Sequence, residues 1–310
     1  MTRYFLNRLV QLIPTILGIY TFAFLLMRVL PGDAANVLAG FRDDQVHLEN
    51  LRRTMKLDEP IFNQYVGFLQ SALVGDFGNS YITGQPVTEM IGDAFPLTVL
   101  LAAVTMLLAV MIGVPLGIVA AVWQDSIWDS VSRLLALLGV SIPVFWLGIQ
   151  FQVLFGLQLK WLPVSGVGFD KHIVLPAITA CGATLALLMR MTRASLLDEL
   201  HQDYARTARG KGLRERSIIW IHVLRNALLP VVTVWGGSLA NLLSGTLLVE
   251  IIFSWPGMGR LLLQAINTRD YPLLQAIVII LALLYAGMNL LVDLSYPLID
   301  PRIRYGQSTA

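Results

Sequence analysis

Basic and small residues alternate in one polar segment of the chain, and this segment carries most of the chemistry that the sequence offers. It runs from Tyr204 to Gly212 and holds Arg206, Arg209 and Lys211 among alanines and glycines. Arg206 and Arg209, three residues apart, would share a helix face and bind acidic groups of a partner. Small residues permit close backbone approach, and a glycine at 210 or 212 ends a short helix. The pattern indicates a docking segment, although contact with phosphate headgroups is equally compatible with its composition.

The sequence gives no reason to expect catalysis. The Gly210-Lys211 pair is followed by Gly212 instead of Ser or Thr, so the chain is not expected to hydrolyse ATP. The four histidines are far apart and the single cysteine, Cys181, lies in an apolar run, so we expect no metal and no cofactor in this chain. No Ser-His-Asp or paired-carboxylate arrangement can be argued. The net charge of +2 gives no reason to expect a nucleic acid partner.

The elements that must position the docking segment are apolar helices. The chain is 56% hydrophobic and 14% charged, which is too apolar for a soluble protein of 310 residues. A helix crosses a bilayer with about 20 residues, and five stretches of such length lack Asp, Glu, Lys and Arg. A sixth is interrupted only by Arg28, which can reach the interface. We therefore expect an all-α membrane protein with six transmembrane helices, at Leu9–Leu30, Pro96–Trp123, Leu134–Leu159, Ile173–Met189, Asn226–Val249 and Tyr271–Val292.

The positive charges favour one orientation. Lys and Arg of the termini and the short loops are concentrated in the segment 190–225, so this segment and both termini are predicted to be cytoplasmic. The chain then divides into the first helix (1–30), an external cap (31–95), a five-helix core (96–300) and a cytoplasmic tail (301–310). Within the cap, the apolar spacing predicts a helix from Gln45 to Phe68. Glycines at 75, 78 and 84 then predict a turn-rich passage.

A few further residues stand out in or beside the spans. Glu250 follows the fifth span on the predicted outer side, where a gating role and a structural role are equally compatible with its position. Asn289 and Asp293, four residues apart, are expected to bond a neighbouring helix. Gly113-x-x-x-Gly117 predicts close helix packing in the second span.

Several motifs together resemble one family. Asp203–Leu213 reads DYARTARGKGL and His222–Pro230 reads HVLRNALLP. Both are similar to the cytoplasmic coupling loop, or EAA loop, of binding-protein-dependent ABC importer permeases, in the form found in the peptide and nickel branch. The resemblance covers nearly the whole chain and includes PGD at 31–33, GDFG at 75–78, WLP at 161–163, FSWPGMGR at 253–260, RDYP at 269–272 and DPRIR at 300–304. Ala34 is a departure, because the family often has proline there.

The resemblance implies a type I ABC importer permease bundle in a bacterial inner membrane. Its partners would be a second, paralogous permease subunit, two ABC ATPase subunits that bind ATP and Mg, a periplasmic substrate-binding protein and the lipid bilayer. The residues expected to couple to the ATPase are Asp203, Tyr204, Arg206, Thr207, Ala208, Arg209, Gly210, Lys211 and Gly212. The candidate periplasmic gate comprises Glu250, Trp255, Pro256 and Gly257.

The expected cargo is a short peptide, with nickel, a chelated metal or glutathione as the alternative within the family. A stand-alone secondary transporter is the competing class. It predicts charged residues inside the spans, which are nearly free of them, and it gives no reason for a coupling loop.

Overall fold

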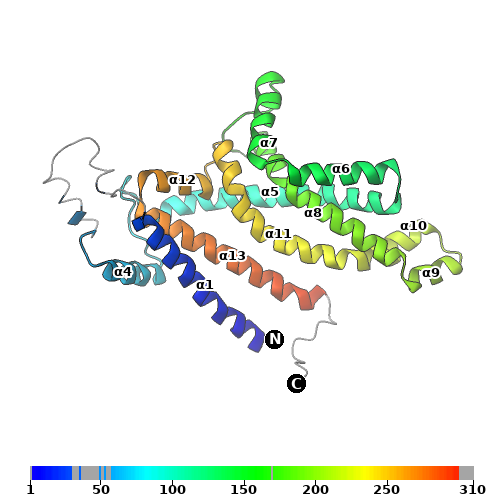
Figure 1. Ribbon diagram of the computed structural model, residues 1–310, viewed down its shortest axis with the longest axis horizontal. Helices are drawn as coiled ribbons and strands as arrows, with labels where there is room; N and C mark the ends of the chain where they lie inside the picture. Colours follow the sequence, from blue (N-terminus) through cyan, green and yellow to red (C-terminus); the bar gives the residue numbers. More distant parts are fainter. Residues whose placement is uncertain are drawn as a thin grey trace. The chain divides into compact units, whose positions relative to one another are not determined.

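A computed structural model describes residues 2–29, 35, 49, 52–53, 57–168 and 170–299, and these residues are almost entirely helical (Figure 1). The helices form two compact units. One contains Val99–Trp255 and the residues from Gly287 onwards; the other contains Thr2–Thr98 and Pro256–Ala286. The motifs at 31–33 and 300–304, the departure at Ala34 and the tail at 301–310 lie outside the described residues.

The first unit is organised around α8 (Val174–Leu200). Helices α6 (Ile127–Ser141), α7 (Val144–Phe151) and α11 (Leu224–Ile252) all pack against it. A Cβ atom on Gly113 or Gly117 of α5 (Val87–Val122) would lie 2.8 or 2.6 Å from a backbone carbonyl oxygen of α8. A Cβ atom on Gly139 of α6 would likewise lie 2.8 Å from the Gly182 carbonyl oxygen of α8. The predicted role of Gly113 and Gly117 in close helix packing is thereby confirmed.

The span predicted over Leu134–Leu159 is not a single helix. Helix α6 ends at Ser141, α7 begins at Val144, and the two pieces are bent by 102°. The break falls at Ile142-Pro143, where the proline forces the preceding residue out of the helical region, to φ −81° and ψ 124°. Helix α7 then continues into a π-helical turn, η1 (Gln152–Gln158).

Four helical stretches of the described residues are long and apolar enough to cross a membrane: Val87–Val122, Val174–Leu200, Glu215–Ser238 and Tyr271–Val292. The bent pair of α6 with α7 and η1 adds a fifth if it is one span. Within α1 (Thr2–Val29), Ile13–Leu25 forms a shorter apolar stretch. The count of six spans stays a prediction. Helix α8 extends beyond the expected Met189 because Leu196, in its last turns, is buried against the polar segment that follows.

Among the described residues, the second unit contains two apolar clusters. In one, α12 (Met258–Thr268) and the start of α13 (Tyr271–Ile299) pack with the first turns of α5. In the other, Tyr20 and Phe24 of α1 pack with Ile279 of α13 and with α4 (Ile61–Leu73). The buried carboxylate of Asp270, just before α13, accepts hydrogen bonds from the Ser80 hydroxyl and, at 3.1 Å, from the Tyr81 amide.

The cap differs from the expectation of one helix over Gln45–Phe68. Residues 57–60 form a turn, and α4 begins only after Pro60. Most of 45–56 lies outside the described residues. Gly75, Gly78 and Gly84 all have positive φ, between 70° and 79°, so the predicted turn-rich passage is confirmed.

Candidate functional site

The polar segment forms a short helix, α9 (Asp203–Gly210), that stands between the ends of two long helices (Figure 1). Helix α8 ends at Leu200, and the chain returns through α10 (Glu215–Ser217) and the π-helical turn η2 (Ile218–Val223) into α11. Ala205 and Ala208, three residues apart, are buried and pack against Leu196 and Ile218. Their small side chains let α9 lie close to both arms, as the composition predicted.

The opposite face of α9 is exposed and charged. Arg206 is 81% exposed, and its guanidinium lies 4.0 Å from the Asp203 carboxylate, which is 99% exposed. Thr207 and Lys211 are exposed as well. Because screening by water leaves such a surface pair little strength, Arg206 keeps its donors available. The arrangement can therefore bind acidic or carbonyl groups of another molecule.

Arg209, unlike Arg206, has close partners within the loop. Its guanidinium pairs with the Glu215 carboxylate at 2.7 Å and donates a hydrogen bond to the Leu200 carbonyl at 3.1 Å. The Glu215 carboxylate raises the pKa of Arg209 above its usual value. Arg209 thus joins the end of α8 to the start of α10 and closes the base of the loop that carries α9.

Two further residues shape this loop. The Tyr204 hydroxyl donates to the Glu199 carboxylate at 2.5 Å, and partial burial together with this bond raises the pKa of Tyr204. Gly212 has φ +78°, and its amide donates to the Arg209 carbonyl at 2.9 Å. A left-handed residue that ends a helix is usually glycine, so the predicted helix end at 210–212 is confirmed.

An ion pair that the sequence did not indicate anchors α8 above this loop. The Asp129 carboxylate, fully buried in the first turn of α6, accepts two hydrogen bonds from the Arg193 guanidinium, at 2.7 and 2.8 Å. The two residues are 64 positions apart in sequence, so no local spacing could have revealed the pair. A bidentate contact of this kind fixes geometry strongly, and it holds the last turns of α8 against α6.

The candidate gate residues are distributed over both units. In the first unit Glu250 and Trp255 are fully buried, and the Trp255 amide donates to the Glu250 carbonyl at 2.8 Å. Gln152 of η1 donates from its amide to the Ile252 carbonyl at 3.0 Å and so caps the end of α11. This cap was not anticipated.

In the second unit Gly257 is buried and Pro256 is half-buried. The next amide, that of Met258, donates to the Thr98 hydroxyl at 2.8 Å. Within the described residues, no group of three or more His, Cys, Asp or Glu side chains is placed to hold a metal ion.

The geometry can be set beside known proteins. A family model described as "Binding-protein-dependent transport system inner membrane component" matches residues 113–305, and a model for the N-terminal part of such membrane components matches residues 1–102. The chain is 43% identical to the glutathione transport system permease protein GsiC of Pectobacterium atrosepticum and 40% identical to that of Escherichia coli K12. Each alignment covers 98% of this chain and 100% of the relative.

A solved structure gives the same picture at the level of the fold. It is titled as the crystal structure of an amino acid ABC transporter with histidines, and it aligns with a TM-score of 0.54 at 13% identity. The alignment covers 67% of this chain and 94% of the other. At this identity the likeness concerns the fold alone.

Proposed function

The chain belongs to the family of binding-protein-dependent transport system inner membrane components, and we propose that it is one of two paralogous permease subunits in an ATP-driven importer of short peptides. Two ABC ATPase subunits would supply the energy by binding ATP and Mg, and a periplasmic binding protein would deliver the cargo. Closure of the ATPases would move the permeases between inward-facing and outward-facing states.

The observation that carries this proposal is the two-sided build of α9. Its alanines face the arms of α8 and η2, whereas Asp203, Arg206, Thr207 and Lys211 face outward. The Arg209 contacts with Leu200 and Glu215 brace the base of the loop. A small helix held in this way moves with α8 and α11 instead of bending away from them. We therefore assign the residues Asp203, Tyr204, Arg206, Thr207, Ala208, Gly210, Lys211 and Gly212 to ATPase coupling, with Arg209 as the residue that positions the loop.

The proposed topology has six spans, with both termini and α9 on the cytoplasmic side of a bacterial inner membrane. The concentration of Lys and Arg between 190 and 225 supports this orientation. The cap at 31–95 would lie in the periplasm. Four helical stretches of spanning length, with the bent pair as a fifth, support five of these spans, and α1 would supply the sixth.

The outer end of the pathway is assigned to Glu250, Trp255, Pro256 and Gly257. Full burial of Glu250 and Trp255 at the end of α11 supports a closed periplasmic gate. A purely structural role for Glu250 predicts that Glu250→Gln leaves the rate of transport unchanged, whereas a gating role predicts a changed rate at normal assembly.

Glutathione is the favoured cargo among short peptides, because the relatives with 43% and 40% identity over the whole chain are named glutathione permeases. Glutathione is itself a small peptide. Nickel or a chelated metal stays the alternative within this family.

Reconstitution tests the proposal. The complete complex is placed in proteoliposomes with its binding protein outside and ATP inside, and uptake of radiolabelled glutathione, dialanine and nickel is measured. ATP-dependent uptake of a peptide is expected, with none from this chain alone. Transport by the purified chain without ATP or ATPase would contradict the proposal.

A further inference from the structure

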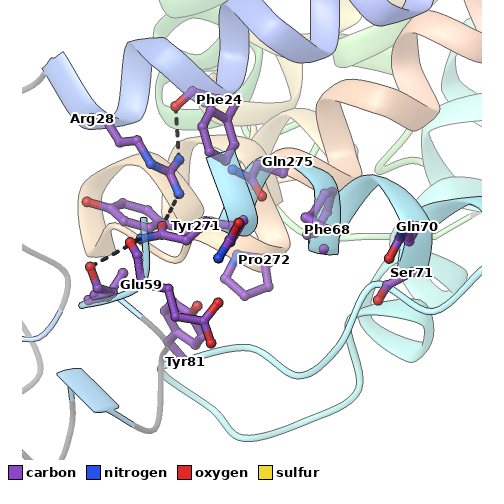
Figure 2. A pocket seen from close by; sticks show the side chains of 14 residues that line it. Phe24, Arg28, Glu59, Phe68, Gln70, Ser71, Tyr81, Tyr271, Pro272 and Gln275 are labelled. Carbon is purple, nitrogen blue, oxygen red and sulfur yellow. Dashed lines mark hydrogen bonds between the residues drawn. The ribbon is translucent and has the colours of Figure 1, made fainter. Parts of the chain in front are cut away.

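A cavity of about 400 Å³ lies within the second unit, and none of the residues assigned to coupling lines it (Figure 2). Its walls come from the end of α1, the turn at 57–59, the helix α4 and the start of α13, with Tyr81 as a further part. Most of the lining side chains are polar. A volume of this size lies within the range of sites for small molecules.

Arg28 provides a positive charge in this cavity. The side chain is half-buried, and its guanidinium lies 3.4 Å from the centre of the Phe24 ring. It donates to the Phe24 carbonyl at 3.1 Å and to the Gln64 side-chain oxygen at 2.5 Å. Both acceptors are uncharged, and no carboxylate of the described residues forms an ion pair with Arg28. Arg28 thus points into the cavity.

Gln64 holds Arg28 in this position. The Gln64 amide donates to the carbonyls of Leu57 and Glu59, at 3.1 and 2.7 Å, so its oxygen must point toward the guanidinium. Figure 2 shows the bond from Arg28 to the Phe24 carbonyl, and the Arg28 guanidinium lies 5.8 Å from the centre of the Tyr271 ring. The cation is therefore pre-positioned, while five N–H donors are more than its two acceptors can use.

Gln275 is the second group that points to a ligand. Its side chain lines the cavity and is 4% exposed, so a molecule bound there would lie beside it. Buried amides are nearly always hydrogen-bonded, because leaving one without a partner is unfavourable. A bound molecule with an acceptor group can take a hydrogen bond from this amide.

The floor of the cavity favours a water-soluble ligand over a phospholipid. Tyr20 stacks on Phe68 with 5.7 Å between ring centres and 12° between planes, and it contacts Phe24 at 5.9 Å. Tyr20 and Phe24 are each 1% exposed. This aromatic cluster packs beside the cavity, whose own lining is mostly polar, and a polar lining suits a water-soluble ligand better than an acyl chain.

We propose that this cavity binds the carboxylate of a short peptide, with Arg28 pairing with the carboxylate and Gln275 donating a hydrogen bond to the same ligand. Glu59 also lines the cavity and offers an acid for the peptide's ammonium group. The choice of a peptide rests on the proposed function, whereas the requirement for a carboxylate rests on Arg28 and Gln275 alone. The site is distinct from the gate and from the coupling segment.

The test uses the complete transporter in lipid nanodiscs without its binding protein. Calorimetric titration with dialanine, glutathione and free glutamate is compared with titration by dialaninamide, which keeps the ammonium group but lacks the carboxylate. Dialanine and glutathione are expected to bind and dialaninamide to bind at least about tenfold more weakly, since a charge-assisted bond is lost. Equal affinity for dialanine and dialaninamide overturns the proposal, as does binding of glutamate alone or of short-chain phosphatidylglycerol in place of the peptides.

Two variants and a control assign the binding to this cavity. Arg28→Gln removes the cation, and Gln275→Glu keeps the shape while opposing a carboxylate; each is expected to weaken dialanine binding about tenfold or more. Arg53→Gln, the same charge change at an exposed position outside the cavity, is expected to leave it unchanged. Melting temperatures of the complexes show whether each variant folds. If a folded Arg28→Gln or Gln275→Glu complex binds like the parent, the cavity is not the site.

ATP-driven uptake separates this inference from the proposed function. A transporter that imports peptide but shows no carboxylate-dependent binding at Arg28 refutes the inference and leaves the proposed function intact. Binding at Arg28 in a chain that transports without ATP would refute the proposed function and leave the site intact.

Discussion

Arg206 and Arg209 lie three residues apart on α9, yet the structure predicts opposite consequences for their replacement. Arg206 faces outward with only a 4.0 Å contact to Asp203, whereas Arg209 is bound within the loop to Glu215 and Leu200. Replacing each arginine by alanine, alone and together with Glu215→Ala, therefore separates docking from loop support.

The expected magnitudes follow from the contacts. The Arg209 and Glu215 side chains are 41% and 54% exposed, so screening limits their pair to about 0.2–1 kcal/mol. The bond to the Leu200 carbonyl adds about 0.5–1.5 kcal/mol. Arg209→Ala should thus weaken ATPase binding about threefold to seventyfold through a loosened loop, and Glu215→Ala at most about fivefold. The double variant should resemble Arg209→Ala alone, because both changes remove one contact.

On the proposed assignment, Arg206→Ala removes a bond to the ATPase itself. A charge-assisted interfacial bond of about 1.5–3 kcal/mol corresponds to a loss of tenfold or more. The effect of Arg206→Ala on the free energy of ATPase binding should add to that of Glu215→Ala. The assay is the dissociation constant between the permease pair in nanodiscs and the purified ATPase subunits. If the Arg206→Ala variant binds the ATPase subunits with the normal dissociation constant, the assignment of the two arginines is wrong. It is also wrong if Glu215→Ala leaves the dissociation constant unchanged while Arg209→Ala and Arg206→Ala raise it equally.

Three further outcomes test other parts of the structure. Gly117→Leu should destabilise the protein by about 1–3 kcal/mol, because even a Cβ there would lie 2.6 Å from atoms of α8. Gly92→Ala on the same helix, with open space around it, should leave the melting temperature unchanged or raise it slightly, and a similar loss in both variants would contradict the close packing at Gly117. Gly212→Ala should lower the free energy of unfolding by about 1–2 kcal/mol, because φ is +78° at this position. Gly210→Ala, in the right-handed helix, should be neutral or slightly stabilising. An equal effect of both variants in thermal unfolding would contradict the loop geometry. Gln152→Leu removes the donor to two carbonyls, at 2.8 and 3.0 Å, so hydrogen exchange in 160–168 should rise, and unchanged exchange there would argue against the cap.

The sequence predicted those features that depend on composition along the chain. Charge-free runs located the long helices, and small residues with a glycine at the end located α9 and its turn at Gly212. The break before α7 could also have been predicted, because Pro143 interrupts an apolar run. The run is long enough for a whole span, however, and was therefore interpreted as one helix. Polar Gln275 inside the last predicted span was a similar signal of a site.

Contacts between distant positions could not be predicted from one sequence. Asp129 and Arg193 each looked like an ordinary charge near a span end, and only the fold brings them within 2.7 Å. The inward turn of Arg209 depends on where α10 returns beneath α9, which spacing on a single helix does not reveal. The spacing of Arg206 and Arg209 therefore could not reveal that, within the chain, Arg206 lies near Asp203 and Arg209 pairs with Glu215.

Labelling and cross-linking at one exposed position of α9 test the central claim most directly. Thr207→Cys is placed in the complete complex, treated with a membrane-impermeant maleimide from either side of oriented vesicles, and cross-linked to the ATPase subunits. Labelling from the cytoplasmic side only, with a cross-link to an ATPase subunit that blocks ATP-driven uptake, is the predicted result. Labelling from the periplasmic side, or uptake at the normal rate with no cross-link to any ATPase subunit, would contradict the account.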